Sequence, residues 1–119
     1  MIMESAAINL SEVKVTLMEE REFIKVGDKQ IEVLERVFDP NDGIYELYAI
    51  GYDLLMFTNR QMMVDGENVR TCSLMRSMDD YLLMVGIYDW KSKLWDIKVG
   101  KKEFRTTTPF ESTIRQMED

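Results

Sequence analysis

The segment from Tyr81 to Val99 constrains the fold of this chain more than any other. It opens with the apolar run YLLMVGIY (81–88) and, after the polar turn Lys91–Lys93, continues with Trp95-Asp96-Ile97-Lys98-Val99. The first run is rich in β-branched and aromatic residues and contains a glycine, which favours a buried strand over a helix. In the second part apolar and charged residues alternate, as in a strand with one wet face. The segment therefore predicts a β-hairpin.

The pairing within this hairpin decides which side chains face the core. Placing Trp90 opposite Leu94 brings Ile87 opposite Ile97. The predicted inner face then holds Tyr81, Leu83, Ile87, Trp95 and Ile97. The opposite face holds Leu82, Met84, Tyr88, Trp90 and Leu94. A slip of one residue would exchange the two faces of a strand. The alternation of side chains along each strand therefore predicts which residues share a face more firmly than the pairing predicts which residues lie opposite each other.

Turn signals divide the rest of the chain into short strands. Asp39-Pro40-Asn41-Asp42-Gly43 is typical of a tight turn, and Asp65-Gly66 of a two-residue hairpin loop. The predicted strands are 12–17, 23–26, 31–38, 44–50, 54–58, 61–64 and 68–75. A helix is the alternative for residues 30–37, because Ile31, Leu34 and Phe38 also fit a period of 3.6 residues.

Two octapeptides resemble each other. Ile24-Lys25-Val26-Gly27-Asp28-Lys29-Gln30-Ile31 matches Ile97-Lys98-Val99-Gly100-Lys101-Lys102-Glu103-Phe104 in its first four residues. The glycine supplies a left-handed backbone position in each. We therefore expect one turn geometry to be used twice, without a duplicated domain.

The C-terminus predicts a short amphipathic helix over residues 109–117. Thr108 fits the N-cap, Pro109 the first helical position, and Glu111 a capping box. Phe110, Ile114 and Met117 then form one apolar stripe. We expect this stripe to pack over an open end or edge of the sheet.

These elements predict one globular domain over residues 1–119, with residues 1–11 as a flexible or short helical arm. With 45% hydrophobic and 31% charged residues, the composition is that of a globular protein. The predicted fold is mainly β (or α+β). It is an antiparallel meander forming a small rolled sheet or barrel, with a short C-terminal helix packed on it.

Charge and cysteine content restrict the partners and the compartment. A net charge of −7 argues against direct nucleic-acid binding and against binding to anionic membranes. A single cysteine allows no intrachain disulfide, which suits a reducing compartment. No signal-like N-terminus and no apolar run of about 18 residues is present. We expect a cytoplasmic protein without membrane contact.

The residue inventory offers no catalytic or metal-binding pattern. Histidine, the usual general base and metal ligand, is absent from the sequence. Cys72 has no histidine partner, and its position predicts a small residue in a strand. The glycines stand singly at turns rather than in a phosphate-binding loop. We expect no cofactor, no metal site and no enzymatic activity.

An interaction role remains, in three forms. The first is a regulatory domain that binds a protein partner, or a second copy in a homodimer, through a sheet edge or the aromatic patch Tyr88, Trp90 and Leu94. The second is an acidic inhibitor that occupies a basic nucleic-acid-binding site on an enzyme. Its candidate residues are Glu19, Glu20, Glu22, Glu32, Glu35, Asp39, Asp42, Asp79 and Asp80. The third is a barrel that holds a small apolar ligand.

Overall fold

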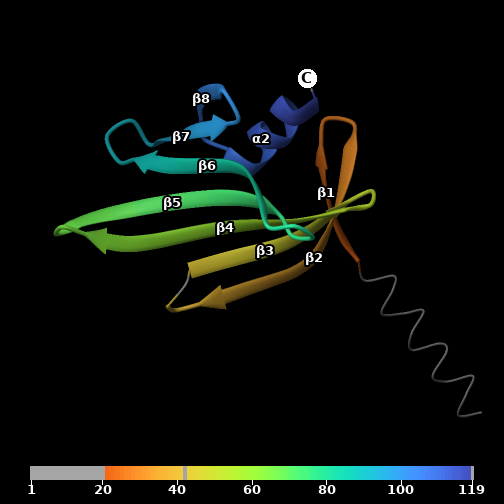
Figure 1. The fold of residues 1–119 in the computed structure, drawn as a ribbon, viewed down its shortest axis with the longest axis horizontal. Helices are drawn as coiled ribbons and strands as arrows, with labels where there is room; N and C mark the ends of the chain where they lie inside the picture. The colour runs from red at the N-terminus through yellow and green to blue at the C-terminus, as the bar shows by residue number, and fades with distance from the viewer. Residues whose placement is uncertain (1–20, 42, 119) are drawn as a thin grey trace, which may run out of the picture.

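The computed structural model describes residues 21–41 and 43–118. These residues form one eight-stranded antiparallel sheet whose strands pair in chain order, followed by one helix (Figure 1). The elements are β1 (Glu22–Val26), β2 (Lys29–Asp39), β3 (Gly43–Ile50), β4 (Asp53–Val64), β5 (Glu67–Arg76), β6 (Tyr81–Asp89), β7 (Leu94–Val99), β8 (Lys102–Thr106) and α2 (Pro109–Glu118). The predicted meander with a short C-terminal helix is confirmed, and the sheet is rolled but not closed into a barrel.

Four sequence predictions concern residues 1–64. The arm at 1–11 and the strand at 12–17 lie outside the described residues. The separate strands predicted at 54–58 and 61–64 are wrong, because β4 runs through both and pairs with β5 without a break. The segment 30–37 lies in β2, so the helical alternative is wrong there.

The β6–β7 hairpin forms, but its register differs by one residue from the predicted one. Asp89 pairs with Leu94, and Gly86 rather than Ile87 pairs with Ile97. The side chain of Asp89 accepts a 3.0 Å hydrogen bond from the N–H of Lys91, and its carbonyl accepts one of 2.8 Å from the N–H of Lys93. These bonds hold a four-residue turn in place of the expected three-residue one.

The changed register moves several side chains to the other face of β6. Ile87 is 58% exposed and points away from the core, whereas Met84 is 1% exposed and belongs to it. Tyr81, also predicted inside, is exposed. Trp95 and Ile97 are buried as predicted, because the alternation within β7 was assigned correctly.

Gly86 allows the close packing of β6 against its neighbours. A Cβ atom at this position would lie 2.5 Å from Cδ1 of Ile97 and 2.6 Å from Sγ of Cys72. Such distances are shorter than any that packed carbon atoms tolerate. The glycine is therefore required by the core rather than by a turn.

The helix α2 completes the core. It packs against β7 and β1, and Figure 1 places it between the two ends of the strand series. The ring of Phe110 stacks on that of Tyr48 with centroids 4.3 Å apart and meets Phe57 edge-on at 5.7 Å. Ile114 is buried, while Met117, the third member of the predicted stripe, is partly exposed. The helix therefore covers the inner face of the rolled sheet.

Three turns lie at the end of the sheet that points away from α2. They are the turns β2–β3, β4–β5 and β6–β7. In a meander every second turn lies at the same end of the sheet, which is why these three do (Figure 1). We call this end the Trp90 end. The residues at or next to its turns include the exposed apolar side chains of Phe38, Met62, Met63, Val64 and Trp90.

Candidate protein-binding site

The β4–β5 hairpin projects beyond its neighbour β3. β3 begins at Gly43, which lies beside Arg60, whereas β4 and β5 stay paired from Gln61–Arg70 to Val64–Glu67. At about 3.4 Å per residue, four further residues extend the hairpin by about 14 Å. Asp65 and Gly66 form its two-residue loop, both with positive φ (51° and 80°), as in a type I′ turn. We call residues 61–70 the hairpin arm.

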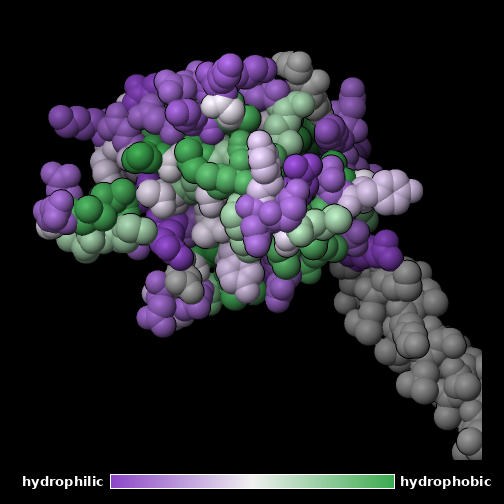
Figure 2. Space-filling view, viewed as in Figure 1, coloured by the Kyte–Doolittle hydropathy of each residue, from purple (hydrophilic) through white to green (hydrophobic). Residues whose placement is uncertain are grey.

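The tip of the hairpin arm is apolar on both faces. Met63 is 68% exposed on one face, and Met62 and Val64 are exposed on the other. Figure 2 shows this apolar tip at the far left, bordered by hydrophilic residues. Met84 is buried in the core, whereas the two methionines at this tip are exposed.

Trp90 lies beside the base of this tip. Its indole Nε1–H donates a 3.0 Å hydrogen bond to the carbonyl of Asn68, and Asn68 pairs across the arm with Met63. The Trp90 ring meets the ring of Tyr88 edge-on, with centroids 4.9 Å apart, and remains 49% exposed. A shallow hollow lined by Glu67, Asn68 and Trp90 opens next to it. An oriented, accessible aromatic ring thus adjoins an apolar hairpin tip.

Asp89 holds the turn that carries Trp90. Besides its bonds within the turn, its carboxylate accepts a 2.7 Å hydrogen bond from Nη2 of Arg105, and the same guanidinium also bonds Ser92 and Asp96. The backbone N–H of Lys91 and the hydroxyl of Ser92, followed by Arg105, lower the pKa of Asp89. The carboxylate form of Asp89 therefore stabilises the turn.

The three predicted patch residues do not lie together. Tyr88 and Trp90 are in contact, and the ring of Tyr88 also meets that of buried Trp95 at 5.1 Å. Leu94 pairs with Asp89, and alternation along β7 places it on the face opposite Trp95. The prediction that all three share a face is wrong because of the register difference. Their role in binding stays a prediction.

Sequence reasoning missed the hairpin arm as part of the site. Asp65-Gly66 was recognised as a loop, and Met62, Met63 and Val64 directly precede it. Apolar residues next to a polar two-residue loop are a signal for an exposed tip. The sequence alone does not show that this loop projects from the sheet. The strand pairing shows it, because β4 and β5 extend beyond the end of β3.

The acidic side chains proposed for an inhibitor are partly neutralised. Arg36 bonds both Glu22 and Glu46, and Arg21 lies 3.5 Å from Glu32. Glu19, Glu20 and Asp42 lie outside the described residues. Ion pairs within the chain leave less charge to imitate a phosphate backbone. The inhibitor hypothesis stays a prediction, without further support from these contacts.

The cleft beneath α2 offers little space for a ligand. A cleft between α2 and the sheet, lined among others by Ile50, Leu55, Leu83 and Ile114, has a volume of about 70 Å³. Pockets for drug-sized ligands measure about 300–1,000 Å³. The ligand-binding hypothesis stays a prediction, and this cleft does not favour it.

Cys72 lies in the core, with its thiol 3.9 Å from the sulfur of Met84. Burial raises the pKa of the Cys72 thiol to about 12, so the thiol stays protonated near neutral pH. Within residues 21–41 and 43–118, no three His, Cys, Asp or Glu side chains are grouped so that they could hold a metal ion.

Comparison with protein-family models, curated proteins and solved structures finds no match for this chain. In the part of the chain that the structure describes, no helix has both the length and the apolar character needed to traverse a bilayer.

Proposed function

We propose that this protein is a small, non-enzymatic interaction domain that binds a protein partner through its Trp90 end. The contact surface consists of the Trp90 ring and the tip of the hairpin arm. The observation that carries the proposal is that the single polar atom of the Trp90 side chain is already bonded to Asn68 while about half of the side chain stays exposed.

This arrangement favours binding because a partner can cover the Trp90 ring without leaving its indole N–H buried and without a hydrogen bond. A tryptophan N–H that loses water on binding must find another acceptor, or it costs about 1–3 kcal/mol. In Trp90 the acceptor is supplied by the protein itself. Tryptophan is also among the residues most enriched at the energetic centres of protein interfaces.

Rigidity supports the same conclusion. The Trp90 ring is held by Asn68 and by Tyr88, and its turn is held by Asp89. A side chain that is ordered before binding loses less conformational entropy when the partner arrives. Met62 and Met63 at the neighbouring tip supply flexible side chains that adapt to a partner surface.

The proposal includes a cytoplasmic location, no cofactor and no direct nucleic-acid or membrane binding. The net charge of −7 supports the expectation that the protein binds neither nucleic acid nor membranes, because phosphate groups and anionic lipids would be repelled.

The test is a pull-down from native lysate with the full chain, followed by mass spectrometry. The wild type is compared with Trp90→Ala and with Tyr52→Ala. Tyr52 is a matched control, because its side chain is fully exposed in the β3–β4 turn at the other end of the sheet. We expect a set of proteins that Tyr52→Ala retains and Trp90→Ala loses. Equal capture by all three chains would contradict the proposal, provided that circular dichroism shows both variants folded.

A further inference from the structure

The strand β8 is an edge strand of the sheet. β8 pairs with β7 on one side and ends the strand order of the sheet. Val99 and Lys102 close its hairpin around Gly100 and Lys101, and φ of Gly100 is 59°. A positive φ at the first loop residue is the pattern of a type II′ turn. The same turn occurs at Gly27 (φ 61°), between β1 and β2.

This hairpin determines which backbone groups of β8 point outward. Val99 and Lys102 stand at the first and last positions of the turn and form a hydrogen-bonded pair. Bonded and non-bonded pairs then alternate along the ladder. Phe104 therefore bonds β7, whereas the N–H and C=O groups of Glu103 and Arg105 point to the open edge. In the part of the chain that is described, no backbone hydrogen bond outside the strands and helix engages either residue.

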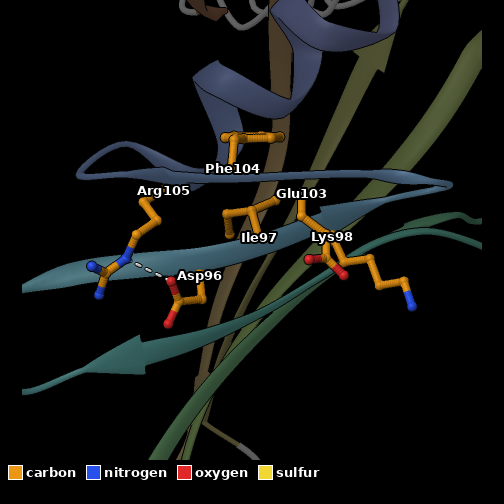
Figure 3. Close-up of a pocket in the computed structure, with 6 residues that line it drawn as sticks. All are labelled: Asp96, Ile97, Lys98, Glu103, Phe104 and Arg105. Atoms are coloured by element: carbon orange, nitrogen blue, oxygen red, sulfur yellow. Dashed lines mark hydrogen bonds and ion pairs between the residues drawn. The ribbon is translucent and has the colours of Figure 1, made fainter.

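The outer face of this edge carries an ordered set of charges (Figure 3). Asp96 pairs with Arg105, whose Nε donates a 2.7 Å hydrogen bond to its carboxylate, and Lys98 pairs in register with Glu103. Figure 3 shows these four side chains on one side of β7 and β8 and Phe104 on the side of the helix. Along β8 the charge is negative at 103 and positive at 105.

From this pattern we infer that two copies of the chain pair through antiparallel β8 edges centred on Phe104. This register places Glu103 of each copy opposite Arg105 of the other and lets the outward groups of both residues bond. On the outer face the charges then alternate across four strands: Asp96 and Arg105 of one copy, then Glu103 and Lys98 of the other. On the inner face the two Phe104 side chains meet. The result is one continuous sheet.

Neighbouring registers lack this complementarity. A pair centred on Glu103 sets two carboxylates opposite each other and faces Arg105 with Lys101. A pair centred on Arg105 opposes two guanidinium groups. Like charges directly opposite each other destabilise a strand pair. The other edge strand, β1, exposes the backbone of Phe23 and Lys25 by the same rule, and a symmetric pairing there joins no opposite charges.

The net charge of the chain does not prevent this pairing. Two copies with a charge of −7 repel each other at long range, but salt at physiological strength screens charges beyond about 8 Å. Side chains opposite each other on paired strands lie about 5 Å apart, within that distance. A pair of five-residue strands covers less than the about 800 Å² per partner of a stable interface. We therefore expect a weak dimer that depends on concentration.

The experiment is sedimentation velocity of the full chain between about 10 µM and about 1 mM, a range that populates weak dimers. The wild type is compared with Glu103→Arg, with Arg105→Glu, and with an equal mixture of the two. Each variant alone opposes like charges and should dissociate at least about tenfold more readily. In the mixture, every contact at the edge again joins opposite charges, so association should return.

A backbone variant covers the case in which Arg105→Glu fails to fold after losing its contacts to Asp89 and Asp96. Glu103→Pro removes an outward N–H that the β7–β8 ladder does not use, a position where edge strands accept proline. It removes about half of the hydrogen bonds between the copies and should abolish the dimer. The matched control is Lys25→Pro, at an outward position of β1, which should associate like the wild type.

Two results would overturn the inference. One is a wild type that stays monomeric over the whole concentration range. The other is association that persists in folded Glu103→Pro. Neither result would contradict partner binding at the Trp90 end, because that proposal does not depend on the β8 edge. The Trp90→Ala variant keeps the β8 edge intact and should dimerise like the wild type.

Discussion

The indole of Trp90 and the carbonyl of Asn68 are joined by a 3.0 Å hydrogen bond across 22 residues of sequence. This bond ties the β6–β7 turn to the hairpin arm, so the exposed ring and the methionine tip keep a defined relation to each other.

Replacing Trp90 by phenylalanine should separate the ring from the hydrogen bond. The phenyl ring of the Trp90→Phe variant keeps an edge-on contact with Tyr88 but has no N–H for Asn68, so the free energy of unfolding should fall by about 0.5–1.5 kcal/mol. Urea denaturation measures this loss. Tyr52→Phe is the control and should change stability by less than about 0.5 kcal/mol. A Trp90→Phe variant as stable as the wild type would mean that the bond contributes nothing to folding.

Met63→Ala and Met84→Ala should differ sharply although the residue types are the same. Met63 is mostly exposed at the tip, and its truncation should cost less than about 0.5 kcal/mol. Met84 is buried in the core, and its truncation should cost about 2–5 kcal/mol. Thermal or urea unfolding measures both values. The proposed function also requires Met63→Ala to weaken partner capture, and unchanged capture would remove the tip from the contact surface.

Gly86→Ala should destabilise the protein by about 1–3 kcal/mol, because the new Cβ overlaps Ile97 and Cys72. Adding Ile97→Val removes the Cδ1 atom nearest to the new methyl group. The double variant should therefore lose less stability than the sum of the two single changes, as measured in a double-mutant cycle. Strict additivity would show that Ile97 is not the obstacle.

Acidification should weaken the β6–β7 turn through Asp89. The folded protein lowers the pKa of this carboxyl below the value of about 3.9 that it has in unfolded chains. Its contribution to stability is therefore complete above the unfolded pKa and is lost as the pH falls through the folded one.

The Asp89→Asn variant isolates this contribution. It should be less stable than the wild type at pH 7, and the difference should shrink as the pH drops below about 4. Urea denaturation at several pH values measures this convergence. A difference that stays constant with pH would show that the carboxylate charge is not what stabilises the turn.

Local rules were sufficient for several elements. The alternation in β7 identified Trp95 and Ile97 as core residues, and Thr108 with Pro109 marked the start of α2 to the residue. The recurring octapeptide correctly indicated that Gly27 and Gly100 adopt the same turn geometry, which Gly51 also adopts. Each of these features is determined by residues that lie within a few positions of it in the sequence.

Part of the candidate site could also be identified in this way. Tyr88 and Trp90 were singled out as exposed aromatic residues; Trp90 is exposed and in contact with Tyr88, but Tyr88 is partly buried and packs against the core. Leu94 was placed with them wrongly, since the hairpin register depends on Asp89 and thus on Arg105, sixteen residues further along the chain. No pattern confined to the hairpin itself contains that contact.

By itself, the sequence determined that the chain alternates into strands, turns at all of its glycines except Gly86 and ends in an amphipathic helix, because these follow from side-chain periodicity and backbone preference. Only the tertiary structure decided which face of β6 is buried, how far β4 and β5 extend past β3, and that β8 is left as an edge. These depend on pairing between distant segments, where packing around Gly86 and the bonds of Asp89 select one register among several that the local pattern allows.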